Sequence, residues 1–159
     1  MIKEIFTEKE LLDSLAVIRE SFRTVADEFG LTISSCPCHP SFLTMDNLAQ
    51  LKEKGVFLFG LFLNDVQIGF VAVENSGSGL FFIEKLAVLP RHRHDSNGAR
   101  LIQYAFDFIR KSGGRTVSIG IIDEHAVLKE WYCSFGFVER EKKRFGHLPF
   151  TVCIMEKSL

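Results

Sequence analysis

Apolar residues in the first part of the chain recur at three- and four-residue spacing, which is the pattern of a helix with one buried face. They are Leu11, Leu15, Ile18, Phe22, Val25 and Phe29. Thr7 precedes this run and Glu10 follows three residues later, as in a capping box, and Gly30 is a common C-terminal stop. The pattern therefore predicts one amphipathic helix that ends at about Phe29.

A second, shorter helix is predicted from Met45 to Lys54, with Thr44 as its cap and Gly55 as its stop. Between the two helices, the segment Ser34–Ser41 contains two prolines, so we expect it to be irregular.

Three β-rich segments follow and are separated by turn residues. The segments are Val56–Leu63, Gln67–Glu74 and Leu80–Val88, and the turns are Asn64-Asp65-Val66 and Asn75–Gly79. With Ile2–Phe6, which we expect to be the first strand of the chain, they predict an antiparallel meander.

The C-terminal part predicts a strand–helix–strand unit and closing strands. A helix from about Gly98 to Lys111 buries Leu101, Ile102, Ala105, Phe108 and Ile109. The next segments are a buried strand over Thr116–Ile122, a helix over Ala126–Ser134, and strands over Gly136–Glu139 and Phe150–Glu156. No repeat or linker interrupts the chain, so we expect one α+β domain over residues 1–159.

Composition and charge argue against several classes of function. The 159 residues are 47% hydrophobic and 25% charged, which is typical of a globular domain. A net charge of −1 lacks the basic excess of a nucleic-acid binder. The N-terminus has no signal-peptide core, and no apolar stretch approaches the roughly 20 residues of a membrane span. We expect a soluble cytoplasmic protein with no nucleic-acid or membrane partner, and with its four cysteines free.

Candidate chemistry is concentrated in Leu86–Ile102, where a strand runs into a polar loop and then into a helix. Backbone N–H groups and the helix dipole converge at such a point and favour an anion. Arg91, Arg93 and Arg100 add positive charge. The segment therefore indicates either a phosphate site or an ordinary strand–helix connection. It matches neither the Walker loop nor the dinucleotide-binding glycine motif, which argues against kinases, NTPases and dehydrogenases.

Two motifs resemble the GNAT superfamily of N-acyltransferases. Val88-Leu-Pro90 followed by Arg93-His-Asp-Ser-Asn-Gly98 is similar to the family's acetyl-CoA loop, Gln/Arg-x-x-Gly-x-Gly/Ala, with Ser96 in place of the first glycine. The segment from His125 to Phe137 is similar to the family's Asn-x-x-x-x-x-x-Tyr-x-x-x-Gly-Phe helix. Tyr132 takes the tyrosine position there, and His125 replaces the asparagine.

The resemblance implies a GNAT-like α+β fold, with a mixed, mostly antiparallel central sheet of six to seven strands and about four helices. Strands four and five would splay apart. It also implies direct transfer of acetyl from acetyl-CoA to an amine in a ternary complex, and it admits a homodimer. The implied cofactor-binding residues are Leu86, Ala87, Val88, Arg93, His94, Asp95, Ser96, Asn97, Gly98, Ala99 and His125.

Two proton transfers need candidates. A departing thiolate has a pKa near ~8.5 and tyrosine one near ~10, so proton donation from Tyr132 costs roughly 2 kcal/mol. An alkylamine is mostly protonated at neutral pH, so a general base is expected. Glu84 is the candidate, because period-two counting places it on one strand face with Leu86 and Val88. The alternatives are a core role for Tyr132 beside Trp131, and a solvated or ion-paired role for Glu84. His125 is expected to cap the following helix or to take the structural place of the asparagine, and the alternative is a role as a base.

Cys36-Pro-Cys-His-Pro40 contains residue types that bind metals, but it has no second ligand pair at zinc-finger spacing, so we expect no metal. The segment either shapes the acceptor pocket or is a rigid connector. We expect a small-molecule amine as acceptor, although no motif identifies it. The alternatives are a CoA-binding sensor without transfer activity, and an enzyme that acts on a protein N-terminus or lysine.

Overall fold

Every expected helix and strand is present in the computed structural model, which describes residues 1–159. The helices are α1 (Glu8–Phe29), α2 (Met45–Glu53), α3 (Asn97–Lys111) and α4 (Ala126–Ser134). The strands are β1 (Ile2–Glu4), β2 (Phe57–Leu63), β3 (Val66–Gly77), β4 (Leu80–Val88), β5 (Thr116–Ile122), β6 (Val138–Arg144) and β7 (Thr151–Ser158). No helix has the length and apolar character needed to cross a membrane.

Local sequence signals explain the helix ends. Thr7 and Glu10 form the expected capping box at the start of α1, and Gly30 ends the helix in the left-handed conformation. Thr44 caps α2 through a second capping box with Asn47. These bonds satisfy backbone N–H groups that a helix leaves free at its start, so the bounds of both helices were predictable.

Several strand bounds differ from expectation, and the differences at β3 and β6 have a clear structural cause. Asn64 and Asp65 both have positive φ and form a two-residue hairpin turn, so Val66 already belongs to β3. β3 continues to Gly77, which leaves only two residues for the next turn. β6 covers Val138–Arg144 rather than Gly136–Glu139, because it pairs along its length with β7.

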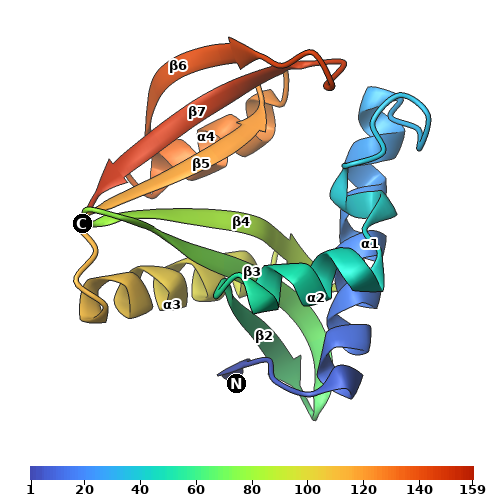
Figure 1. Ribbon diagram of the computed structural model, residues 1–159, viewed down its shortest axis with the longest axis vertical. Helices are drawn as coiled ribbons and strands as arrows, with labels where there is room; N and C mark the ends of the chain where they lie inside the picture. The colour runs from blue at the N-terminus through green and yellow to red at the C-terminus, as the bar shows by residue number, and fades with distance from the viewer.

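The strands form one seven-stranded sheet in the order β1-β2-β3-β4-β5-β7-β6. Every pair is antiparallel except β4 and β5, which are parallel and joined through α3. β4 and β5 pair only over Leu80–Phe82 and Thr116–Ser118, and beyond these residues they diverge. Figure 1 shows the gap that opens between the two strands, with α1 and α2 on one face of the sheet and α3 on the other.

Aromatic contacts anchor α3 to the sheet. Phe59 of β2 lies 5.1 Å from Tyr104 and 5.0 Å from Phe108, measured between ring centroids. On the other side of the core, Ser14 of α1 exchanges hydrogen bonds with the buried Gln67 of β3. These contacts hold α3 against β2 and α1 against β3.

β4 contains a bulge at Lys85, whose φ is +54°. The register shows the extra residue. Ala72 pairs with Glu84, whereas Phe70, two residues away on β3, pairs with Ala87, three residues away on β4. A bulge of this kind bends the strand and disrupts the ladder locally, here beside the gap.

The bulge overturns the expectation that Glu84 shares a strand face with Leu86 and Val88. Cross-strand partners lie on the same face, so Glu84 shares its face with Ala87, and Val88 lies on the opposite one. Period-two counting failed because Lys85 adds one residue to the strand.

Candidate active site

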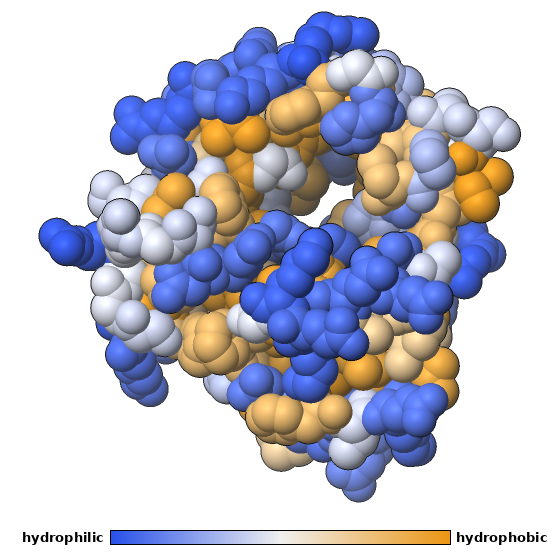
Figure 2. Space-filling model, viewed as in Figure 1, coloured by the Kyte–Doolittle hydropathy of each residue, from blue (hydrophilic) through white to orange (hydrophobic).

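A cavity of about 990 Å³ opens where β4 and β5 diverge. Its walls come from α1, the segment between α1 and α2, β4, the loop before α3 and the first turn of α3, β5, α4, and the β6–β7 connection with the start of β7. The hollow is visible near the centre of the face shown in Figure 2. Residues from both halves of the chain therefore meet around one space.

All but one of the site residues expected from the sequence line this cavity. They are Glu84, Leu86, Ala87, Val88, Arg93, His94, Ser96, Asn97, Gly98, Ala99, His125 and Tyr132. The exception is Asp95, which is exposed and lies outside the cavity lining.

The first turn of α3 offers hydrogen-bond donors to the cavity. The backbone N–H groups of Asn97, Gly98 and Ala99 have no acceptor within the protein. Ser96 occupies the N-cap position with φ +60°, and its side chain makes no capping bond. Three free N–H groups and the positive end of the helix dipole make a site that suits a phosphate.

The backbone of Ser96 is in the left-handed region, which favours glycine. This conformation explains why the acetyl-CoA loop motif usually has a glycine at this position. The serine keeps its backbone N–H and carries the cost of the conformation, about 1 kcal/mol.

Arg93 holds the loop in place. Its Nε donates to the carbonyl of Val88 at 3.1 Å. Its Nη1 and Nη2 donate to Thr24 Oγ1 at 3.0 Å and to the Ser21 carbonyl at 2.7 Å. Burial lowers the pKa of Arg93, and no carboxylate pairs with it. The side chain therefore ties the end of β4 to α1, and its positive charge stays at the cavity wall.

The two other arginines of this segment are also engaged within the protein. Arg91 pairs with Glu20 of α1 at 3.0 Å, and Arg100 donates to Asn97 Oδ1 at 3.3 Å. Neither of these guanidinium groups lines the cavity, so Arg93 is the arginine of this segment that adds its charge directly to the cavity wall.

The facing edges of β4 and β5 are unpaired beyond Phe82 and Ser118. Edge groups of this kind can accept an extended chain as if it were another strand. The unpaired stretch of β4 runs from Ile83 to Val88 and ends close to the free N–H groups of α3.

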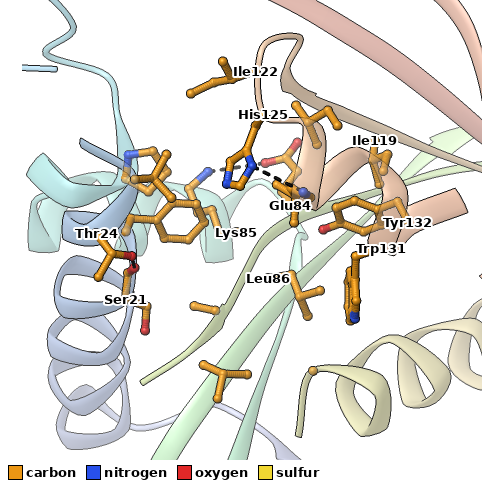
Figure 3. Close-up of a pocket in the computed structure, with 18 of the residues that line it drawn as sticks. Ser21, Thr24, Glu84, Lys85, Leu86, Ile119, Ile122, His125, Trp131 and Tyr132 are labelled. Atoms are coloured by element: carbon orange, nitrogen blue, oxygen red, sulfur yellow. Dashed lines mark hydrogen bonds and ion pairs between the residues drawn. The ribbon is translucent and has the colours of Figure 1, made fainter. Parts of the chain in front are cut away.

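Tyr132 is both a core aromatic and a cavity residue. Only 6% of it is exposed, and its ring packs against Trp131 and Phe137 with centroid separations of 5.0 and 5.5 Å. Burial raises the pKa of its hydroxyl well above the ordinary value. The hydroxyl has no hydrogen bond within the protein, and Figure 3 shows it directed into the cavity from α4.

Glu84 lines the cavity on β4 and is ion-paired, with Lys85 Nζ 3.4 Å from its carboxylate. It also lies beside Glu74, whose pKa is raised by burial and by the charge of Glu84. His125 caps α4 as expected, because its Nδ1 accepts the N–H of Leu128 at 3.3 Å. Both side chains lie on the cavity wall in Figure 3.

Sequence reasoning missed the contribution of α1 to this cavity. Ser21, Phe22, Thr24, Val25 and Glu28 all line it, and Figure 3 shows Ser21 and Thr24 across the space from Tyr132. The helical spacing marks some of these residues as buried but cannot tell a cavity-facing residue from one that packs on the sheet. Ser21 Oγ is buried and has no hydrogen-bond partner.

Three side chains of types that can bind a metal lie close together outside the cavity. Asp123, Glu139 and Cys153 hold their ligand atoms within 4.8 Å of one another. Lys129 Nζ lies 2.7 Å from Asp123 and 3.6 Å from Glu139, so an ammonium group already bridges the two carboxylates. The arrangement is that of an ion-pair cluster.

Comparison with solved structures shows the fold again. The ribosomal-protein-S18-alanine N-acetyltransferase from Escherichia coli aligns with a TM-score of 0.78 at 16% identity, over 99% of this chain and 92% of that chain. PaiA N-acetyltransferase from Thermoplasma acidophilum, solved with coenzyme A, gives 0.74 at 18% identity, over 100% and 99%. An aminoglycoside 6'-N-acetyltransferase complexed with coenzyme A gives 0.73 at 16% identity, over 99% and 96%.

No curated protein sequence matches the chain. A family model does match it: the model for the acetyltransferase (GNAT) family covers residues 23–137, which is most of the chain and includes both motifs noted in the sequence. The chain therefore belongs to the acetyltransferase (GNAT) family.

Proposed function

We propose that this protein is an N-acetyltransferase that uses acetyl-CoA to acetylate the amine of a small molecule in a ternary complex. The main support for the proposal is the set of free N–H groups on α3. They border the same cavity as the unpaired edge of β4 and the hydroxyl of Tyr132. Phosphate donors, an edge for an extended chain and a proton donor are the groups that acetyl transfer from CoA needs.

The residues present fit acetyl-CoA, which would supply the activated acetyl group. The N–H groups of Asn97, Gly98 and Ala99 would hold the pyrophosphate. The edge of β4 over Leu86–Val88 would hold the pantetheine arm by backbone hydrogen bonds. Arg93 keeps these two parts of the site together through its bonds to Val88 and α1.

Tyr132 is proposed as the general acid. Its raised pKa keeps the phenol protonated, as an acid must be. The same shift makes complete proton transfer to a thiolate cost more than the roughly 2 kcal/mol expected from ordinary pKa values. Tyr132 would therefore act mainly by a hydrogen bond that strengthens as negative charge develops on the sulfur.

Glu84 is proposed as the base that removes a proton from the acceptor, directly or through water. It lines the cavity on the strand face shared with Ala87, and its ion pair with Lys85 holds the carboxylate at the wall. Deprotonating an alkylamine at neutral pH costs roughly 4–5 kcal/mol, which a carboxylate base would help to offset.

The size of the cavity favours a small acceptor. Ligand pockets usually measure ~300–1,000 Å³, and this cavity of about 990 Å³ must hold the pantetheine arm as well as the acceptor. The similar structures include acetyltransferases named for a ribosomal protein and for aminoglycosides, so structural likeness does not choose between protein and small-molecule acceptors.

Thermal unfolding with acetyl-CoA tests cofactor binding. At 100 times the Kd, a ligand stabilises the fold by about 2.7 kcal/mol, which raises Tm by several degrees. NAD and ATP at the same concentration should leave Tm nearly unchanged. A shift with NAD or ATP but none with acetyl-CoA would overturn the proposal. Thiol release with a pool of amines then separates an enzyme from a CoA-binding sensor.

Ala99→Pro tests the phosphate site. Proline is tolerated in the first turn of a helix, and here it removes an N–H that has no acceptor in the protein. The variant should fold, and its Kd for CoA should rise by about tenfold, the value of one hydrogen bond to a charged group. An unchanged Kd would contradict the assignment. A Gly98 variant is less clean, because a Cβ there would lie 3.1 Å from Trp131.

A further inference from the structure

His39 lines the cavity and leaves one ring nitrogen without a hydrogen-bond partner in the protein. It lies in the loop between α1 and α2, only 6% of it is exposed, and it lines the cavity next to Phe22. The ring makes edge contacts with Phe22 and Phe42, with centroid separations of 5.8 and 6.3 Å. The imidazole is therefore fixed in orientation by apolar neighbours.

The hydrogen bonds of His39 define its tautomer. Nδ1 accepts the backbone N–H of Ser41 at 3.3 Å and lies 2.7 Å from Ser41 Oγ, which is also buried. A nitrogen that accepts an N–H carries a lone pair, so in the neutral ring the proton is on Nε2. Nε2 has no hydrogen-bond partner within the protein. Burial lowers the pKa of His39 to about 4, so the ring is neutral at pH 7.

Charges of both signs line the cavity, with the carboxylates of Glu28 and Glu84 on one side of the balance and the cations of Lys85 and Arg93 on the other. Glu28 lies at the rim without an ion-pair partner, and Glu84 lines the wall with only Lys85 beside it. Both carboxylates attract a protonated amine and repel an anion. An uncharged N–H donor such as Nε2 of His39 suits an uncharged oxygen. Much of the remaining wall is apolar, with Leu148 and Phe150 among its residues.

We propose that Nε2–H of His39 is a specificity-determining donor that binds an uncharged oxygen of the acceptor. The preferred acceptors would then be amines with an apolar body and a nearby carbonyl or amide oxygen, such as amino-acid amides. This inference rests on the proposed acetyltransferase function. It also gives the Cys36–Pro40 segment a role, because this segment carries the histidine to the cavity.

Matched acceptors test the proposal. Leucinamide and 3-methylbutylamine share the branched side chain and differ by the carboxamide. In a thiol-release assay with acetyl-CoA, kcat/KM should be at least about tenfold higher for leucinamide, the range of one buried hydrogen bond and its unsatisfied partner. Because the carboxamide also makes the amine less basic, the contribution of His39 is measured as the change in this preference when His39 is substituted.

Two substitutions separate the atoms of the ring. His39→Asn offers an oxygen that can still cap Ser41 but removes the donor at Nε2, so the ratio of kcat/KM for leucinamide to kcat/KM for 3-methylbutylamine should fall about tenfold. His39→Gln can place an N–H near the position of Nε2, so it should retain most of the preference even if the loop loses stability. Tm of each variant checks folding.

Equal use of leucinamide and 3-methylbutylamine by the wild type would overturn the proposal, as would failure of both amines to react. Equal loss with both substrates in His39→Asn would also overturn it, because that result indicates a structural or basic role. The shift in Tm with acetyl-CoA measures cofactor binding, so it tests the proposed function separately from the amide preference. If acetyl-CoA binds and the amide preference is absent, only the inference about His39 is wrong.

Discussion

At the scale of single residues, Tyr132 combines two demands that normally conflict. Its ring is packed among Trp131 and Phe137, yet its hydroxyl is left without a partner inside the protein. The hydroxyl opens on the cavity, where a ligand atom can become its hydrogen-bond partner.

Tyr132→Phe should separate these roles. The substitution removes one hydroxyl and little volume, so Tm and the Kd for CoA should stay close to those of the wild type. Turnover should fall by ~10²–10⁴, the range of general acid–base groups. The loss should appear equally in kcat and kcat/KM, because the interaction develops only as the thiolate leaves.

Tyr104→Phe is the matched control, because Tyr104 of α3 packs against Phe59 of β2 and does not line the cavity. Its turnover should match the wild type. If Tyr132→Phe keeps more than about a third of wild-type turnover, the tyrosine is not the acid.

His39 should make the stability of the fold depend on pH. Its pKa is about 4 in the folded protein, because burial disfavours the charged ring, and ~6.5 in an unfolded chain. The unfolded state then binds more protons between these values, so the free energy of unfolding should fall as pH drops from ~6.5 towards 4. The loss should be of the order of 1–3 kcal/mol.

Urea unfolding at several pH values measures this loss, and His39→Asn should flatten the curve in the same window. Glu10 titrates lower, because bonds from Lys3 and from two backbone N–H groups lower its pKa to about 2. A wild-type curve that is already flat between pH 6.5 and 4 would contradict a buried neutral His39.

At the scale of elements, Arg93 joins three parts of the fold: the end of β4, the loop before α3, and α1. Arg93→Met would keep the length of the side chain and remove its three hydrogen bonds, to the carbonyls of Val88 and Ser21 and to Thr24 Oγ1. We expect a loss of about 1–3 kcal/mol in the free energy of unfolding. The Kd for CoA should also rise, because the loop is no longer held.

Arg91→Met is the control for this prediction. Arg91 is mostly exposed and pairs only with Glu20 at 3.0 Å, so its loss should cost less than about 1 kcal/mol. Urea unfolding and calorimetry with CoA measure both variants. Equal effects for Arg91 and Arg93 would show that Arg93 has no special role.

Elements were predictable where a local bond determines them. Residues close together in the chain determine the capping boxes at Thr7 and Thr44 and the turn at Asn64-Asp65. The bulge at Lys85 was not predictable, because lysine has no preference for positive φ and the pairing with β3 imposes it. Period-two counting therefore placed Glu84 on the right strand and on the wrong face.

The same limit applies to the candidate site. The loop from Arg93 to Ala99 and the position of Tyr132 follow from short motifs, because their residues lie close together in the chain. The wall formed by α1 depends on tertiary packing, and an apolar residue such as Val25 has the same helical spacing whether it faces the sheet or the cavity. The role of His39 required the contact with Ser41, which composition and spacing do not show.

At the scale of the whole molecule, the sheet consists of two parts joined weakly. β1–β4 form one part and β5–β7 the other, and only Leu80–Phe82 pair with Thr116–Ser118 between them. The remaining length of the two facing edges borders the cavity (Figure 1). A ligand that bridges the gap would therefore add contacts that the free protein lacks.

Hydrogen–deuterium exchange should show this bridging. Edge amides without a partner exchange through local openings of low free energy, and a bound ligand that accepts their hydrogen bonds should slow the exchange. Acetyl-CoA should slow exchange most in peptides covering Ile83–Ala99, which contain the free edge of β4 and the first turn of α3. Peptides from the β2–β3 hairpin, whose amides are already paired, are the internal control and should change little. Protection spread evenly over the chain, or confined to α2 and β6, would place acetyl-CoA outside the gap between β4 and β5.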